Sequence, residues 1–365
     1  MKSGIININK GQNMTSHDVV SIVRRAVGIK RVGHTGTLDP MAEGVLPVAV
    51  GNATKFIEYL DKDIKTYVAG VKLGIKTDTL DIWGEKLENT KVDCTGEELK
   101  EKLSGIIPRF IGEIQQIPPK FSAVKVNGRR LYDYARKSQD VEIPKRNVHV
   151  YKLEYISPDD MEYIASLTGI MPSSVGEVKN DFFLLIECSR GTYVRSLIRD
   201  IGSELGLSAV MSFLVRTASG EFQIDDGISA ESIKNMDIGE LYKCIFPIDE
   251  KISCMRSIVL DDIESRKFQN GGKVSMKKIK YLEGEKSIMK DRSFHNDYRV
   301  VYTDLYKVYR GKRQGDSSDF ELPRISNVAD MKSTDRFLGV GRIVQDRFLK
   351  GEKVVPIESE EYEIF

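Results

Sequence analysis

Four side chains that could take part in chemistry lie close together near the start of the chain: His34, Thr35, Thr37 and Asp39. They belong to the stretch GHTGTLDPMAEGVLP, residues 33–47. Its glycines leave the backbone free, whereas the proline after Asp39 excludes helical backbone at that aspartate. The sequence therefore predicts one carboxylate presented from a stiffened turn, beside an imidazole and two hydroxyls.

The residues around Asp39 do not suit a metal ion. No cysteine and no second histidine lies near them at the spacing of metal ligands. We therefore expect chemistry without a metal and without a cofactor. Taken alone, the pattern is also that of an Asx-type turn between two elements, so its interpretation depends on the rest of the chain.

The run GHTGTLDPMAEGVLPVAVGNATK, residues 33–55, closely resembles the signature of the TruB-type pseudouridine synthases. Four further blocks resemble other motifs of this family, over about the first two-thirds of the chain: KTYVAGVKLGIKTDTLDIWGE, Gln115 to Arg136, CSRGTYVRSL and LVRTASG. The resemblance implies an enzyme that isomerises the uridine at position 55 in the T-loop of tRNA. It implies the stand-alone bacterial branch, which needs no guide RNA.

The resemblance also assigns roles to individual residues. It implies that Asp39 is the catalytic aspartate, that Tyr67 lies against the target base and that Arg195 faces Asp39. It further implies substrate-binding roles, for which the candidates are His34, Thr35, Thr37, Leu214, Lys10, Lys125 and Arg130. As bare patterns, Tyr67 and Leu214 would be ordinary core residues, because each lies among apolar residues of strand type.

Arg195 also stands out by its position. It falls in the first turn of a helix expected from Val194 onward, where the helix dipole disfavours a cation. A cation at that place indicates an acidic partner. We expect this partner to be Asp39, kept ionised by the nearby opposite charge.

The residues leave the course of the reaction open. Asp39 could attack C1′, attack C6 or take the C2′ proton of the nucleotide, and one carboxylate can serve in each case. Tyr67 would stack on the uracil and assist a proton transfer at C5. We assign His34 to holding or replacing the nucleotide that must leave its stack before reaction.

Several elements must position these groups. We expect a strand over residues 4–9, then a helix with a capping box of Thr15 and Asp18 that ends near Gly28. The family usually has Lys-Pro-x-Gly in the turn between them, where this chain has Lys10-Gly11-Gln12-Asn13, so we expect a looser turn. Further expected elements are a strand at 65–74, an Asn-Gly hairpin within 115–136, a buried strand at 181–189 and the helix of Arg195.

These elements and the resemblance predict an α+β fold. It combines a catalytic domain, with a large, mostly antiparallel mixed sheet flanked by helices, and a small β-rich domain that resembles a PUA-type RNA-binding module. We expect the domains at residues 1–250 and 251–365, with insertions near 157–181 and 311–333.

Charge is distributed unevenly along the chain, although the net charge is only +1. Residues 119–152 hold nine Lys or Arg and three Asp or Glu, and residues 266–313 hold fourteen and five. Such patches suit a polyanion. We expect the T-arm and elbow of tRNA as the partner, and nothing in the sequence demands more than a monomer.

The remaining composition indicates a cytoplasmic protein. The four cysteines form no Cys-x-x-Cys pair and are typical of inert thiols in a reducing cytosol. The N-terminal residues MKSGIININK do not form a signal peptide, and no stretch approaches the roughly 20 apolar residues of a membrane helix.

Three alternatives remain at this point. The chain could act mainly as an RNA-folding factor, which is compatible with a synthase. It could be a glycoside hydrolase with Asp39 as nucleophile, which needs a second carboxylate such as Glu43. It could also be the guide-RNA-dependent relative found in archaeal and eukaryotic ribonucleoproteins, which activity on bare tRNA would exclude.

Overall fold

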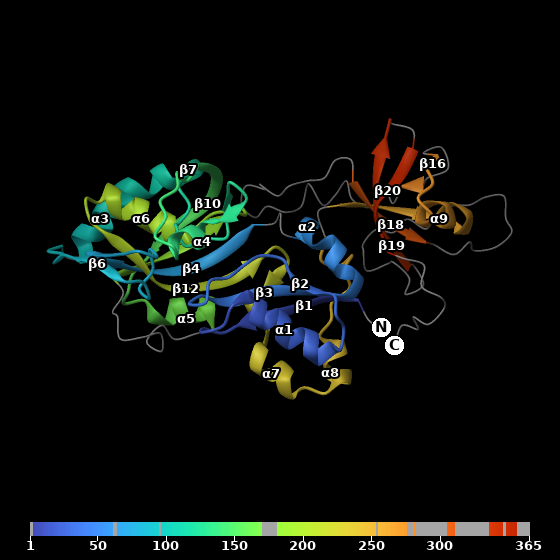
Figure 1. The fold of residues 1–365 in the computed structure, drawn as a ribbon, viewed down its shortest axis with the longest axis horizontal. Helices are drawn as coiled ribbons and strands as arrows, with labels where there is room; N and C mark the ends of the chain where they lie inside the picture. Colours follow the sequence, from blue (N-terminus) through green and yellow to red (C-terminus); the bar gives the residue numbers. More distant parts are fainter. Residues whose placement is uncertain are drawn as a thin grey trace. The chain divides into compact units, whose positions relative to one another are not determined.

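The computed structural model describes residues 3–60, 64–94, 96–169, 181–252, 255–275, 280–281, 305–310, 336–345 and 348–355. The chain forms two compact units (Figure 1). One consists of Ile6–Ala49 and Leu60–Ile245, and the other of Met1–Ile5, Val50–Tyr59 and Phe246–Phe365. The predicted division at residue 250 stays a prediction.

The larger unit is built on a 10-stranded mixed sheet with the order β14-β1-β3-β12-β4-β11-β10-β7, in which β13 pairs with β12 and β2 with β3. The strands are β1 Gly4–Lys10, β2 Val32–His34, β3 Glu43–Val50, β4 Lys65–Leu73, β7 Gly112–Gln116, β10 Arg146–Ile156, β11 Phe182–Cys188, β12 Ala209–Ser219, β13 Phe222–Gln223 and β14 Ile228–Ser229. The pairs from β12 through β7 are antiparallel, whereas β12 pairs with β3 and β1 with β14 in parallel. The predicted sheet and fold class are confirmed.

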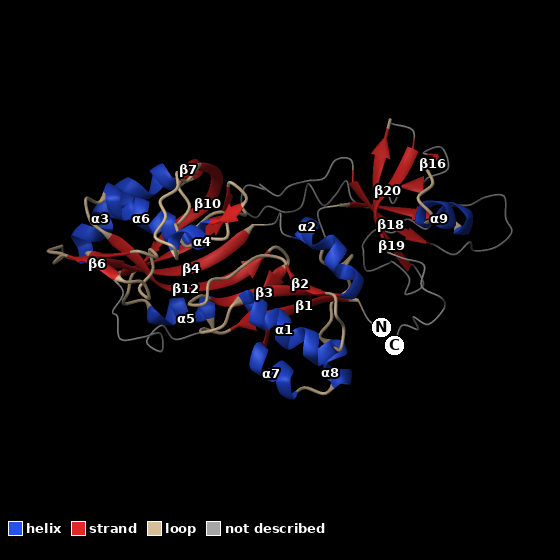
Figure 2. Ribbon diagram, viewed as in Figure 1, coloured by secondary structure: helices blue, strands red, loops and turns tan. Residues whose placement is uncertain are grey.

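Helices flank this sheet (Figure 2). They are α1 Ser16–Val27, α3 Gly96–Ile106, α4 Leu131–Ala135, α5 Met161–Thr168, α6 Val194–Glu204, α7 Ala230–Asn235 and α8 Ile238–Lys243, with the 3-10 turns η2 Ile107–Phe110 and η4 Ile224–Asp226. The hairpins β5 Ile75–Thr77 with β6 Lys86–Asn89, and β8 Lys125–Val126 with β9 Arg129–Arg130, stand outside the main sheet. Helix α5 lies within the predicted insertion, of which residues 170–180 are outside the described part.

The two faces of the central strands pack against different parts of the protein. Val68 of β4 and Phe213 and Val215 of β12 pack with Ile164 of α5 in one apolar cluster. Because side chains alternate along a strand, the intervening residues face the opposite side, where α6 also packs on β4 and β12. Tyr67, Leu214 and Arg216 therefore share one face.

The smaller unit has a six-stranded sheet with the order β16-β20-β19-β18-β15-β17. Its strands are β15 Arg256–Leu260, β16 Val274–Ser275, β17 Lys280–Tyr281, β18 Leu305–Arg310, β19 Arg336–Val344 and β20 Phe348–Val354, and its helix is α9 Asp262–Gln269. Buried apolar residues of the sheet surround Phe268 of α9. The segment η1 Gly51–Phe56 with α2 Ile57–Leu60 joins this unit through Phe56, whose ring lies 5.7 Å from that of Phe337. The predicted β-rich C-terminal domain is thus present, while the insertion near 311–333 lies outside the described residues.

Candidate active site

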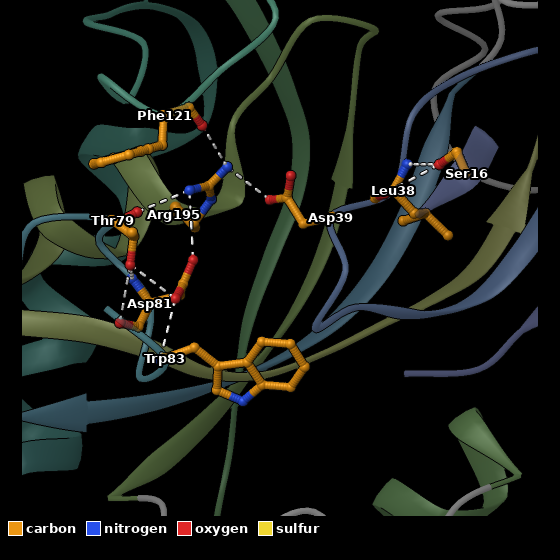
Figure 3. Close-up of polar contacts among 8 residues, drawn as sticks. All are labelled: Ser16, Leu38, Asp39, Thr79, Asp81, Trp83, Phe121 and Arg195. Atoms are coloured by element: carbon orange, nitrogen blue, oxygen red, sulfur yellow. Dashed lines mark hydrogen bonds and ion pairs between the residues drawn. The ribbon is translucent and has the colours of Figure 1, made fainter. Parts of the chain in front are cut away.

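The turn that carries Asp39 is fixed from two sides by hydrogen bonds. Ser16, the first residue of α1, accepts a hydrogen bond from the Leu38 backbone N–H at 2.8 Å and donates one to the Leu38 carbonyl at 3.1 Å (Figure 3). On the other side, the Ala42 N–H donates to the Asp39 carbonyl and the Asn13 N–H to the Pro40 carbonyl, both at 3.0 Å. The start of α1 and the turn before it therefore set the position of Asp39.

Asp39 forms an ion pair with Arg195, with 2.8 Å between Oδ2 and Nη2. The two side chains differ in exposure, since Asp39 is 35% exposed and Arg195 only 5%. The arginine is held from within the protein, and the carboxylate is presented at the surface of the site. The expected pairing of these residues is present, while their catalytic roles stay predictions.

A network of acceptors holds the Arg195 guanidinium (Figure 3). Nη1 donates to the Thr79 carbonyl at 2.8 Å and lies 3.4 Å from Oδ2 of Asp81, while Nη2 also donates to the Phe121 carbonyl at 3.1 Å. Asp39 and Asp81 thus approach the cation at different nitrogens. These partners fix the orientation of the buried guanidinium. Removing one of them would leave part of its charge uncompensated inside the protein.

Asp81 is a site residue that the sequence interpretation missed. Its Oδ1 accepts hydrogen bonds from the Thr79 hydroxyl at 2.8 Å and the Trp83 N–H at 3.1 Å, within a tight turn between β5 and β6. Burial raises the pKa of this carboxyl, against the opposing effects of Arg195 and Thr79. Asp81 lies in the TDTLD segment of the second motif, so the sequence did contain a candidate carboxylate there. Nothing in the local pattern, however, links Asp81 to Arg195, which follows 114 residues later.

Gln116, which the sequence interpretation also missed, fixes the start of α6. Its buried amide accepts from the Tyr193 N–H at 3.0 Å and donates to the Tyr193 carbonyl at 3.2 Å. One turn further, the Ser196 hydroxyl donates to the Ile117 carbonyl at 2.8 Å. The end of β7 therefore fixes the helix from which Arg195 projects.

Tyr67 and Leu214 lie on the β4 and β12 strands of the same face. Both are buried, with 9% and 6% exposure, as their apolar surroundings predict. Burial raises the pKa of the Tyr67 phenol, and the neighbouring Arg216 opposes this shift. Contact of either residue with a base stays a prediction.

The residues around Asp39 take different positions in the turn. His34 is half-buried on β2, Thr37 is exposed, and Thr35 is buried with its N–H donating to the Pro47 carbonyl at 3.1 Å. Lys10 is fully buried, and its Nζ donates to the carbonyls of Gly11 at 2.8 Å and Met14 at 3.0 Å. Desolvation lowers the pKa of Lys10 to about 8, against the raising effects of Glu43 and Asp39.

The position of Lys10 suggests a task other than the predicted contact with substrate. Its ammonium closes the turn that follows β1, in which Asn13 has the left-handed φ of 61°. The Lys10 ammonium therefore stabilises this loop, which lacks the proline that the family usually has there. A direct substrate contact of Lys10 stays a prediction that this geometry does not favour.

Lys125 and Arg130 lie on the exposed β8–β9 hairpin. Asn127 and Gly128 both have positive φ, 52° and 80°, as a two-residue hairpin turn requires. The predicted Asn-Gly hairpin is therefore confirmed. Arg130 donates to the Tyr132 hydroxyl at 3.2 Å, and the Arg136 guanidinium lies 5.4 Å from the Tyr132 ring centre. The result is a preformed basic and aromatic surface.

The described residues contain neither a candidate metal site nor a candidate membrane span. Among the described residues, no group of three or more His, Cys, Asp or Glu could hold a metal ion. Within the same part of the chain, no helix is long and apolar enough to cross a membrane.

Comparison with known proteins gives consistent matches along the chain. Residues 24–194 match the family model described as TruB family pseudouridylate synthase (N terminal domain), and residues 195–253 match the tRNA pseudouridylate synthase B C-terminal domain. The tRNA pseudouridine synthase B of Caldanaerobacter subterraneus subsp. tengcongensis is 44% identical over 268 residues, 73% of this chain and 85% of that protein. The protein of the same name from Staphylococcus saprophyticus is 40% identical over 297 residues, 81% of this chain and 92% of that protein.

Solved structures with a similar fold include a Cbf5-Nop10-Gar1 complex, at a TM-score of 0.60 and 22% identity, covering 97% of this chain and 85% of the other. A second is an H/ACA RNP bound to a substrate RNA containing 2′-deoxyuridine, at a TM-score of 0.58 and 22% identity, covering 96% and 84%. At this identity the similarity shows a shared fold.

Proposed function

The chain belongs to the TruB family of pseudouridylate synthases, and from this premise we propose that it isomerises the uridine at position 55 in the T-loop of tRNA. Asp39 is the catalytic group, and no metal or cofactor takes part. The observation that carries this proposal is the ion pair of the half-exposed Asp39 with the buried Arg195. A fixed carboxylate at the surface of the site can reach a nucleotide placed against it.

The reaction requires few protein groups. The N1–C1′ bond breaks, the C5–C1′ bond forms, the proton on C5 leaves and N1 gains a proton. No oxidation and no net proton release occur, so one carboxylate and one proton acceptor suffice. Asp39 acts at the sugar or the base, Tyr67 lies against the uracil and assists at C5, and His34 holds or replaces the nucleotide that leaves its stack.

RNA binding would use the exposed basic surface of the larger unit. The β8–β9 hairpin offers Lys125 and Arg130 for phosphates, and Tyr132 for a base. The β-rich C-terminal domain would add contacts as a PUA-like module to the elbow of tRNA. We propose that a cytoplasmic monomer binds tRNA in this way without a guide RNA. The relatives named tRNA pseudouridine synthase B support tRNA as the partner.

The second carboxylate of the site argues against glycoside hydrolysis. Such hydrolases need two carboxylates that face the substrate across the scissile bond. Asp81 is only 11% exposed and is engaged by Arg195 and Thr79. The Asp81 carboxylate therefore orients Arg195 and does not face a substrate.

A position-resolved product assay tests the proposed function. The purified protein is incubated with an unmodified tRNA transcript, and pseudouridine is mapped along the RNA. We expect product only at the T-loop uridine, and a rate at least about 10³-fold lower for Asp39→Asn. Binding of the transcript should persist in this variant.

Two outcomes would contradict the proposal. Product at another position would refute the assigned site, and an active Asp39→Asn enzyme would refute the assigned residue. A folded wild-type protein that binds the transcript without making product would favour the RNA-folding alternative.

A further inference from the structure

Arg216 is a buried arginine at the centre of the sheet. It lies on β12, is 1% exposed and is among the largest fully buried side chains of the described residues. It pairs in register with Tyr67 of β4 on one side and with Gly44 of β3 on the other. A side chain at Gly44 would meet the Arg216 carbonyl, because a Cβ built there lies 2.2 Å from that oxygen. The sequence is thus adapted to a close fit at this point.

The guanidinium of Arg216 binds two segments of the active site, and a third lies beside it. Nε donates to the Val45 carbonyl at 2.6 Å, and Nη2 donates to the Gly36 carbonyl at 3.3 Å. Gly36 belongs to the Asp39 turn and Val45 to the strand that follows it. Tyr67 is the neighbour of Arg216 on the same face, because the two residues are opposite each other in the register of β12 and β4. One cation therefore holds the turn of Asp39 and lies beside Tyr67.

The stability of the fold does not by itself explain why a cation occupies this buried position. A charge taken out of water and placed on backbone carbonyls loses more solvation than an apolar residue of similar volume would. A nearby positive charge favours the anionic form of a phenol, and burial opposes it. Arg216 is therefore placed where it can affect both the position and the ionisation of Tyr67.

We propose that Arg216 is a positioning residue that acts through Tyr67, holding the phenol at a fixed distance from the Asp39 turn and favouring its anionic form when it takes the C5 proton. This inference rests on the proposed function. In the step concerned, the C5–C1′ bond has formed, and C5 still carries its hydrogen. The proton passes from C5 to the oxygen of the Tyr67 anion, the electron pair of the C5–H bond returns to the ring, and N1 takes a proton from solvent. Tyr67 then passes its proton to solvent.

Single-turnover kinetics with normal and 5-deuterated uridine at the target position test the inference. For Arg216→Lys we expect a rate about 10- to 100-fold lower and a deuterium isotope effect larger than that of the wild type. For Arg216→Gln, which also removes the charge, we expect in addition a rate that rises with pH further into the alkaline range. The reason is that loss of Tyr67 from its position slows removal of the C5 proton alone. Arg199→Lys is the matched control, since Arg199 lies on α6 and pairs with Asp200, and we expect it to leave all three readouts unchanged.

A double variant shows whether Arg216 acts through Tyr67. If it does, Arg216→Lys combined with Tyr67→Phe should be no slower than Tyr67→Phe alone. Multiplying losses, a slower Arg216→Lys enzyme with the wild-type isotope effect, or an Arg216→Gln enzyme with the wild-type pH profile would overturn the inference. Arg216→Gln, which keeps a hydrogen-bond donor without the charge, serves the same tests if the lysine variant does not fold. A wild-type enzyme that forms no pseudouridine would overturn the proposed function as well, whereas these results with an active wild type overturn this inference alone.

Discussion

At the scale of single residues, the site divides its tasks between an exposed and a buried group. Asp39 is open to a substrate, whereas Arg195 is enclosed by Asp39, Asp81 and two backbone carbonyls. A guanidinium has a fixed planar arrangement of donors. Its orientation, and with it the position of the Asp39 carboxylate, therefore depends on Asp81 on its other side.

This dependence can be tested with Asp81→Asn, which keeps the shape of the side chain and removes its charge. We expect kcat to fall about 10- to 100-fold, because a small displacement of a catalytic group is enough for such a loss. KM for tRNA should change little, since Asp81 is buried. Steady-state kinetics on an unmodified transcript measures both constants.

Asp200→Asn provides the matched control for this prediction. Asp200 is on the same helix as Arg195 and also pairs with an arginine, Arg199, at 2.8 Å. Its removal should leave kcat unchanged. Equal losses in the two variants would show that any charge removed near α6 lowers the activity, and would contradict the role given to Asp81.

At the scale of elements, helix α1 has two separable functions. Thr15 caps the helix together with Asp18 in a capping box, which concerns only the stability of the helix end. The next residue, Ser16, bonds both backbone groups of Leu38. The adjacent hydroxyls of Thr15 and Ser16 therefore stabilise different parts of the molecule.

Two alanine variants should separate these functions. Ser16→Ala leaves two buried backbone groups of Leu38 without their partner, so we expect a loss of about 1 to 3 kcal/mol in the free energy of unfolding and a clear drop in kcat. Thr15→Ala should lose about 1 kcal/mol of stability through the cap alone and keep its kcat. Chemical denaturation and kinetics at a temperature well below both transitions measure the two effects. A parallel loss of kcat in Thr15→Ala would refute the separation.

Several elements could be predicted from the sequence alone. The capping box of α1, the left-handed Gly28 at its end, the Asn-Gly hairpin and the buried strand β11 each follow from a local pattern of a few residues. The cation in the first turn of a helix indicates that Arg195 has an acidic partner, and the resemblance to the family implies that this partner is Asp39.

What the sequence did not show are polar contacts between distant segments. Gln116 meets Tyr193 across 77 residues, and Arg216 meets Gly36 across 180. A buried glutamine at a strand end, or an arginine within an apolar strand, has no local pattern that names its partner. Lys10 likewise is a candidate substrate-binding residue in the sequence, and only the folded loop shows its ammonium on two carbonyls.

At the scale of the whole molecule, attraction to RNA must come from the arrangement of charge, since the net charge is only +1. In the larger unit, the exposed hairpin β8–β9 and the helix after it carry Lys125, Arg129, Arg130 and Arg136. Each cation placed on a phosphate releases counterions, which makes affinity fall with salt. The slope of log affinity against log salt is therefore a measure of the number of phosphate contacts.

Arg130→Gln should accordingly weaken binding of tRNA at low salt and reduce the slope of log affinity against log salt by about 1. Lys125→Gln should reduce it by a similar amount, and the two effects should add, because each residue neutralises its own phosphate. Binding titrations at four or five salt concentrations measure the slope, with catalytically inactive Asp39→Asn as background so that product formation does not interfere. Lys243→Gln is the control, since Lys243 is exposed on α8 and paired with Glu240, and its slope should equal that of the background protein. If Arg130→Gln weakened binding without changing the slope, the guanidinium would act by holding the Tyr132 ring rather than by meeting a phosphate.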